Sequence, residues 1–148
     1  MSNLLRSLEK KNLLYKYIDD IDWFLNGKFF EPSHRWTKKR KDSFTRRISK
    51  LIENECQTVS ASTLDFTPIN HHSKQKKTVF TDGNGKGLSF LKHIRNGIAH
   101  GHANLYFPKT PYIEIRDYQK SGEQTAYFYI PLDYLTKIIK IYRFVETS

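Results

Sequence analysis

The chain of 148 residues contains a single cysteine, Cys56, and no long hydrophobic run. One cysteine excludes an intrachain disulfide and a cysteine-rich zinc site. No stretch approaches the roughly 20 apolar residues of a membrane-spanning helix, and the first residues lack the basic and apolar regions of a signal peptide. We therefore expect a cytoplasmic protein with no membrane partner, folded as one domain over residues 1–148.

Acidic residues are scarce beside basic ones: 15 Asp and Glu face 25 Lys and Arg, a formal charge of +10. Such a surplus favours polyanionic partners, nucleic acid above all. Residues 35–50 contain eight basic residues and one acid, a surplus of seven in one short element. A solvated helix face and a surface for the phosphate backbone both explain this run. The candidate RNA-binding residues are Lys38, Lys39, Arg40, Lys41, Arg46, Arg47 and, farther along the chain, Lys92.

The pattern of apolar residues predicts four helices, at residues 4–25, 36–56 and 87–102 and from Pro131 onward. Two alternating segments, 112–117 and 125–130, predict a β-hairpin with a Ser-Gly turn. Residues 57–86 show no period and are expected to form a long loop, with His71 and His72 exposed to solvent. The expected fold is mainly α: a four-helix up-and-down bundle with a hairpin (112–130) inserted before the last helix.

The third helix carries a polar corner on an otherwise apolar element. Phe90, Leu91, Ile94 and Ile98 recur at the spacing of a buried stripe. On the other side, Asn96 and His100 are four residues apart and lie one turn above each other, with Arg95 at the flank.

Arg95-Asn96-Gly97-Ile98-Ala99-His100 has the form R-N-x-x-x-H. This motif in a helical, basic chain resembles the HEPN superfamily, in particular small bacterial proteins of abortive-infection and plasmid-borne type. The resemblance implies metal-independent endoribonuclease activity without a cofactor. It also implies a homodimer in which Arg95 and His100 of both protomers line one composite active site. Related toxin members often have a tyrosine two residues after the histidine, where this chain has His102, so an antitoxin or regulatory protein that depends on that tyrosine is put in doubt.

The motif residues suit RNA cleavage. An imidazole such as His100 titrates near neutral pH, so it can deprotonate a 2′-hydroxyl for attack on the adjacent phosphorus and protonate the leaving oxygen. The forked guanidinium of Arg95 fits the charge that builds on the phosphate oxygens, and Asn96 is placed to orient phosphate or imidazole. His93 and His102 are auxiliary candidates, for which we favour surface or dimer-contact roles.

Three hypotheses follow. The first is an endoribonuclease that acts as a toxin or phage-defence effector and leaves 2′,3′-cyclic phosphate ends. The second is a non-catalytic HEPN module that binds RNA or a partner protein. The third, the least favoured, is a metal-dependent nuclease that uses Asp19, Asp20 and Asp22 with histidines.

Overall fold

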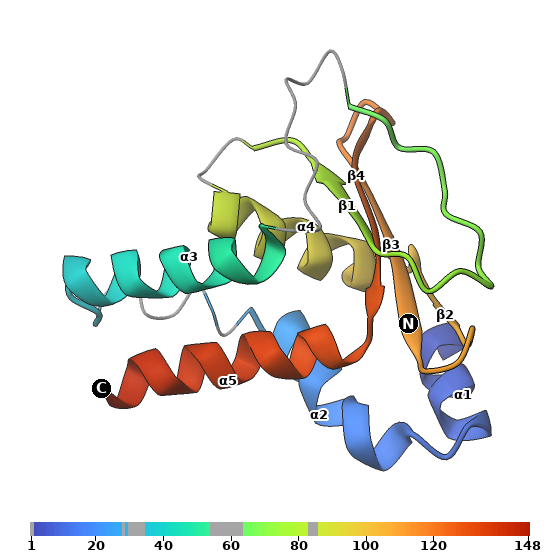
Figure 1. Cartoon of the computed structure of the whole chain (residues 1–148), viewed down its shortest axis with the longest axis horizontal. Helices are drawn as coiled ribbons and strands as arrows, with labels where there is room; N and C mark the ends of the chain where they lie inside the picture. The colour runs from blue at the N-terminus through green and yellow to red at the C-terminus, as the bar shows by residue number, and fades with distance from the viewer. Residues whose placement is uncertain (1, 28, 30–34, 54–63, 83–85) are drawn as a thin grey trace.

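The computed structural model describes residues 2–27, 29, 35–53, 64–82 and 86–148. This part of the chain folds into helices and a single β-sheet, with strands both before and after α4 (Figure 1). In chain order the elements are α1 (Ser2–Lys10), α2 (Leu14–Leu25), α3 (Lys38–Ile52), β1 (Lys77–Phe80), α4 (Lys86–Ala99), β2 (Ala103–Tyr106), β3 (Tyr112–Tyr118), β4 (Gln124–Pro131) and α5 (Asp133–Thr147).

The expected four-helix bundle with an inserted hairpin is wrong. The expected hairpin strands are present as β3 and β4, but they form the centre of a four-stranded antiparallel sheet in the order β1-β4-β3-β2. The two edge strands have four residues each, which is too short for a period-two pattern to stand out. One of them, β1, lies inside the expected loop 57–86, and the other follows directly after the motif helix.

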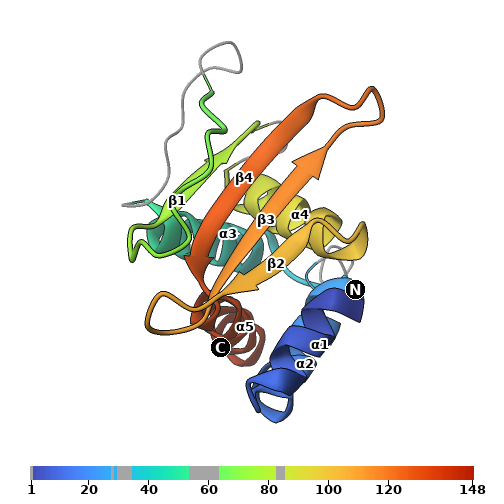
Figure 2. The same cartoon turned by 90° about the vertical axis from the view of Figure 1, so that its right-hand side faces the viewer.

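The sheet is covered by helices on one face only (Figure 2). Ile113 and Ile115 of β3 and Phe128 of β4 point to that face and join the main hydrophobic core. The expected apolar stripe of α4 is confirmed, because Phe90, Leu91, Ile94 and Ile98 are all buried. The helix that carries the motif therefore packs on the central strands of the sheet as well as on α2 and α3.

Other helix boundaries also differ from the sequence predictions. The first helix is broken into α1 and α2, because Asn12 adopts a φ of 56°, a left-handed conformation that ends an α-helix. The second is shorter than residues 36–56, and Cys56 lies outside the described residues. Pro131 closes β4 instead of opening α5. Within the described ranges, no helix has the length and apolar character needed to cross a bilayer.

Candidate functional site

The C-terminal end of α4 closes with a left-handed glycine. Gly101 has a φ of 78°, its N–H donates to the carbonyl of Ile98, and the N–H of His102 donates to the carbonyl of Gly97 at 2.8 Å. This is a Schellman motif, in which His100 is the C-cap. The motif histidine thus stands where the helix turns into β2, with its side chain exposed.

The side chains of Arg95 and Asn96 lie together on α4. Nη1 of Arg95 donates to Oδ1 of Asn96 at 3.3 Å, which is a long hydrogen bond. Nε of Arg95 is buried and, among the residues that the structure describes, has no hydrogen-bond partner. A buried guanidinium donor without an acceptor is costly. Because this Nε is closed to solvent, an anion can reach only the exposed part of the half-buried Arg95 side chain.

His100 is the third motif residue, and its ring meets another histidine. Its ring centroid lies 6.5 Å from that of His102, which in turn lies 5.0 Å edge-to-face from the ring of Tyr118. Within the described residues the His100 side chain forms no hydrogen bond or ion pair. Its imidazole is therefore accessible, whereas Arg95, five residues earlier on the same helix, is half-buried.

His93 is not a surface histidine, which corrects the sequence interpretation. Its side chain is 13% exposed, and Nδ1 lies 2.7 Å from Oδ2 of Asp117. Nε2 lies 3.0 Å from the carbonyl oxygen of Thr81. His93 therefore ties α4 to the end of β3 and to the segment after β1, a structural role that positions the motif helix.

Gly97, inside the motif, is where α4 lies against β3. A Cβ atom at this position would stand 2.2 Å from Cγ2 of Ile115 and 2.8 Å from the carbonyl oxygen of Arg116. Both distances are below any ordinary contact, and the second involves backbone that cannot turn aside. The absence of a side chain here thus allows the helix to approach the sheet.

We expect Gly97→Ala to destabilise the fold by about 1–3 kcal/mol, the usual cost of overpacking. Alanine is intrinsically the better helix residue by about 1 kcal/mol, so a net loss isolates the steric effect. Urea unfolding measures it, with Ala99→Ser at an exposed position as the control. Unchanged or increased stability of Gly97→Ala would show that the helix does not approach the sheet this closely.

The candidate RNA-binding residues of α3 stand on its solvent side. Lys38 pairs with Asp42 at 3.1 Å, and Nη2 of Arg40 donates to the carbonyl oxygen of Ser148 at 2.6 Å. Lys39 and Arg46 are exposed and make no hydrogen bond or ion pair within the described ranges. A shallow hollow on this helix is lined by Lys38, Lys39, Asp42, Ser43 and Arg46.

The other predicted RNA-binding residues differ in their exposure and in their contacts. Nε of Arg47 donates to Oγ of Ser43, and its guanidinium lies 4.5 Å from the ring centre of Phe144. Lys41 is exposed on α3, and Lys92 is half-buried on α4. The basic face and the motif lie apart, since α3 meets α4 near Gly87. His100 is thirteen residues farther on, about 20 Å at the rise of an α-helix.

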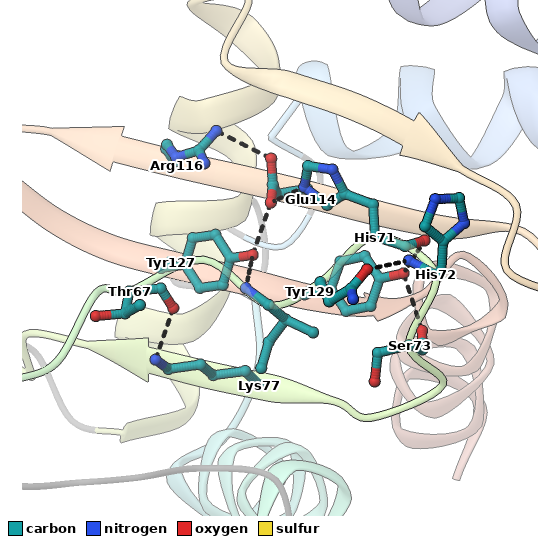
Figure 3. Close-up of polar contacts among 11 residues, drawn as sticks. Thr67, His71, His72, Ser73, Lys77, Glu114, Arg116, Tyr127 and Tyr129 are labelled. Atoms are coloured by element: carbon teal, nitrogen blue, oxygen red, sulfur yellow. Dashed lines mark hydrogen bonds and ion pairs between the residues drawn. The ribbon is translucent and has the colours of Figure 1, made fainter.

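A second polar cluster lies on the other face of the sheet and was missed in the sequence (Figure 3). Glu114 of β3 is 1% exposed. Its carboxylate accepts hydrogen bonds from the hydroxyl of Tyr127 at 2.6 Å and from Nη1 of Arg116 at 2.9 Å, and Nε2 of His71 lies 2.7 Å away. Burial and the neighbouring carboxylate raise the pKa of the Tyr127 phenol, so it remains a donor.

Residues 64–76 cover this cluster and are held by tyrosine hydroxyls. Tyr129 donates to the carbonyl oxygens of His71 and Ser73, and Tyr112 donates to that of Lys74. The expectation that His71 lies free in a solvent loop is wrong, because its ring contacts Glu114. The alternation of β3 placed Glu114 on the outer face, but no sequence signal showed that a distant segment covers it.

The aspartates of the metal-nuclease hypothesis, Asp19, Asp20 and Asp22, lie on different sides of α2. Oδ2 of Asp20 accepts a hydrogen bond from the hydroxyl of Thr136 at 2.6 Å, which ties α2 to α5. Across the described part of the chain, no three His, Cys, Asp or Glu side chains come together as a potential metal site. Asp20 therefore has a structural role in this fold.

Comparison with known proteins identifies the family. The model of the family described as HEPN pEK499 p136 matches residues 9–146, which include every element from α2 to nearly the end of α5. No curated protein and no solved structure matches the chain. The match confirms the resemblance seen in the R-N-x-x-x-H motif, and the chain belongs to the HEPN pEK499 p136 family.

Proposed function

We propose that the protein is a metal-independent endoribonuclease whose active site is formed by Arg95, Asn96 and His100. The observation that carries this proposal is an accessible imidazole at the end of α4, with a partly exposed guanidinium five residues earlier on the same helix. A catalytic base must be reachable by substrate, and an electrophilic stabiliser must have donors to spare. Family membership is consistent with this chemistry.

In this mechanism the RNA supplies its own nucleophile. His100 removes the proton of a 2′-hydroxyl and becomes an imidazolium, and the 2′-oxygen bonds to the adjacent phosphorus. The bond from phosphorus to the 5′-oxygen of the next nucleotide breaks as that oxygen takes a proton from the imidazolium. Arg95 binds the phosphate oxygens as negative charge builds on them. Asn96, held to Arg95 at 3.3 Å, orients the guanidinium. The products are a 2′,3′-cyclic phosphate and a 5′-hydroxyl.

Cleavage of matched RNA and DNA strands tests this reaction. The purified protein, in EDTA, is incubated with an end-labelled RNA, with the same sequence as DNA, and with the RNA carrying one 2′-deoxynucleotide at a mapped cleavage site. We expect cleavage of the RNA, none of the DNA, and loss of the band at the deoxy position alone. Equal cleavage of DNA would exclude attack by the 2′-hydroxyl.

We also propose that two protomers complete the site, with both copies of Arg95 and His100 lining one cleft. Arg95→Ala and His100→Ala should each be inactive alone. Mixed dimers, formed by refolding the two variants together, should recover part of the activity because one arginine and one histidine then share a cleft. Native mass spectrometry confirms that mixed dimers are present. If they form and remain inactive, the composite site is wrong.

The exposed basic face of α3 favours a second candidate function, a non-catalytic module that binds RNA. Lys39→Glu with Arg46→Glu should weaken RNA binding for all sequences alike. The slope of log affinity against log salt should fall by about 0.7 for each lost contact to single-stranded RNA. Lys140→Glu on the exposed side of α5 is the matched control. Affinity and slope that respond equally to both changes would exclude a specific role for α3.

With the ribonuclease activity, the chain is proposed to act as a toxin or phage-defence effector with an antitoxin or regulatory protein as a further partner. Identification of the RNA fragments that accumulate when the protein is expressed would test this role. The HEPN domain is proposed to span residues 1–148 as one unit.

A further inference from the structure

Among the described residues, part of the outer sheet face has no segment packed over it (Figure 2). Residues 64–76 pass over the β1 side, whereas β2 and β3 face the viewer uncovered in Figure 2. Their outward residues follow from alternation: Ala103 and Leu105 belong to the helix-covered core, and Tyr106 belongs to the cluster on the opposite face. His102 and Asn104 are exposed. We call this surface the open face; it comprises His102, Asn104, Arg116 and Tyr118, with Tyr106 and His71 at its far end.

The open face begins beside the proposed catalytic histidine. The N–H of Arg116 donates to the carbonyl oxygen of His102 at 3.0 Å, so His102 extends the β2–β3 ladder by one residue. The rings of His100, His102 and Tyr118 follow one another at centroid distances of 6.5 and 5.0 Å. An RNA strand bound at His100 would therefore lie next to the rings of His102 and Tyr118.

Aromatic rings also stand at the other end of the open face. His71 and Tyr106 are stacked with centroids 3.6 Å apart, and the side chain of His71 is 35% exposed. From His102 to Tyr106 is four residues, about 13 Å along a strand. The aromatic groups are therefore spaced along a path that a few nucleotides can follow.

The charge of the open face suits a polyanion. Its one buried carboxylate, Glu114, is hydrogen-bonded by Arg116 at 2.9 Å and by Tyr127 at 2.6 Å. Arg116 is itself 28% exposed at the centre of the face. The charges of Glu114 and Arg116 balance each other, so this pair adds no net negative charge to the face of a chain whose formal charge is +10.

We propose that the open face binds single-stranded RNA next to the cleavage site, with a base stacked on Tyr118. This inference rests on the proposed ribonuclease function and adds the path of the substrate. Aromatic stacking of successive bases along a surface with positive charge is how sequence-tolerant single-strand binding is achieved. Tyr118 is the proposed stacking residue because it is a large apolar side chain with 36% exposure and its ring contacts that of His102 edge-to-face.

The test measures binding of a short fluorescent 2′-O-methyl RNA, which has no 2′-hydroxyl to react. Tyr118→Ala should weaken binding about tenfold or more, the usual cost of losing one stacked base. Tyr118→Leu, which keeps apolar bulk without a ring, should also lose affinity, whereas Tyr118→Trp should retain it. Tyr15→Ala is the matched control, because Tyr15 is an 81% exposed tyrosine on α2.

Equal affinity of Tyr118→Ala and Tyr15→Ala, or retained affinity in Tyr118→Leu, would overturn the proposal. Unfolding curves of all four variants show whether any loss reflects the fold, and the leucine and tryptophan variants then decide. Cleavage of unmodified RNA by the wild-type chain is measured separately. If binding depends on Tyr118 but no RNA is cleaved, the ribonuclease proposal is wrong and the RNA-binding role of the open face stands. If RNA is cleaved but binding does not depend on Tyr118, the ribonuclease proposal stands and the role of the open face is wrong.

Discussion

Replacing His100 with alanine should lower the rate of RNA cleavage by about 10²–10⁴-fold, the contribution typical of a positioned general acid–base residue. The fold should be retained, because the side chain is exposed. Its unfolding free energy should change by less than about 1 kcal/mol. Single-turnover cleavage assays measure the rate, and urea unfolding of the same preparation measures the free energy of unfolding. His72→Ala, at an exposed histidine of the segment over the sheet, is the control and should keep full activity.

At Arg95, the rate of RNA cleavage should depend on the shape of the side chain as well as on its charge. Arg95→Lys keeps a positive charge but loses the forked donors and the Nε that now lacks an acceptor. It should therefore recover only a small part of the activity lost in Arg95→Ala. Full activity of the lysine variant would show that Arg95 contributes only its positive charge. Full activity of His100→Ala would show that His100 is not the catalytic base.

Replacing Glu114 with alanine should destabilise the protein by about 3 kcal/mol, because it leaves buried donors without an acceptor. The hydroxyl of Tyr127 is the main loss, since Tyr127 is fully buried. Arg116 and His71 are partly exposed and can regain water. Urea unfolding followed by tryptophan fluorescence and by far-ultraviolet circular dichroism measures the change.

Glu123→Ala, an exposed glutamate on the β3–β4 turn, is the control for Glu114 and should change stability by less than about 0.5 kcal/mol. Glu114→Ala should also release residues 64–76, which proteolysis at Lys74 and Lys76 would report as faster cleavage. His71→Ala should accelerate this cleavage with a smaller effect on global unfolding. Equal stability of the two glutamate variants would show that the cluster contributes little.

The sequence predicted the parts of the structure that depend on local pattern. The apolar stripe of α4 has a clear helical period, β3 has isoleucines two residues apart, and β4 is a short apolar run after a Ser-Gly turn, so these elements were found near their true positions. The edge strands were missed because their pairing is decided by the sheet and not by four residues of chain. Asn12 gave no strong signal that the first helix would divide.

The motif itself was found from sequence, whereas its surroundings were not. Spacing predicted Asn96 and His100 one turn apart with Arg95 at the flank, but it could not show that His100 is the C-cap of the helix or that His93 is inside the fold. The contact of Gly97 with Ile115 and the burial of Glu114 under residues 64–76 join segments far apart in the chain. Such contacts are set by tertiary packing, which no local period contains.

The central claim is cleavage by the 2′-hydroxyl of the substrate with His100 as the base, and the chemistry of the product ends tests it most directly. Wild-type protein in EDTA should leave 2′,3′-cyclic phosphate and 5′-hydroxyl ends, identified by mass spectrometry of the fragments. His100→Ala should leave none of these ends, and His72→Ala should leave as many as the wild type. Ends with a 3′-hydroxyl and 5′-phosphate, or cyclic phosphate produced equally by His100→Ala, would contradict the account.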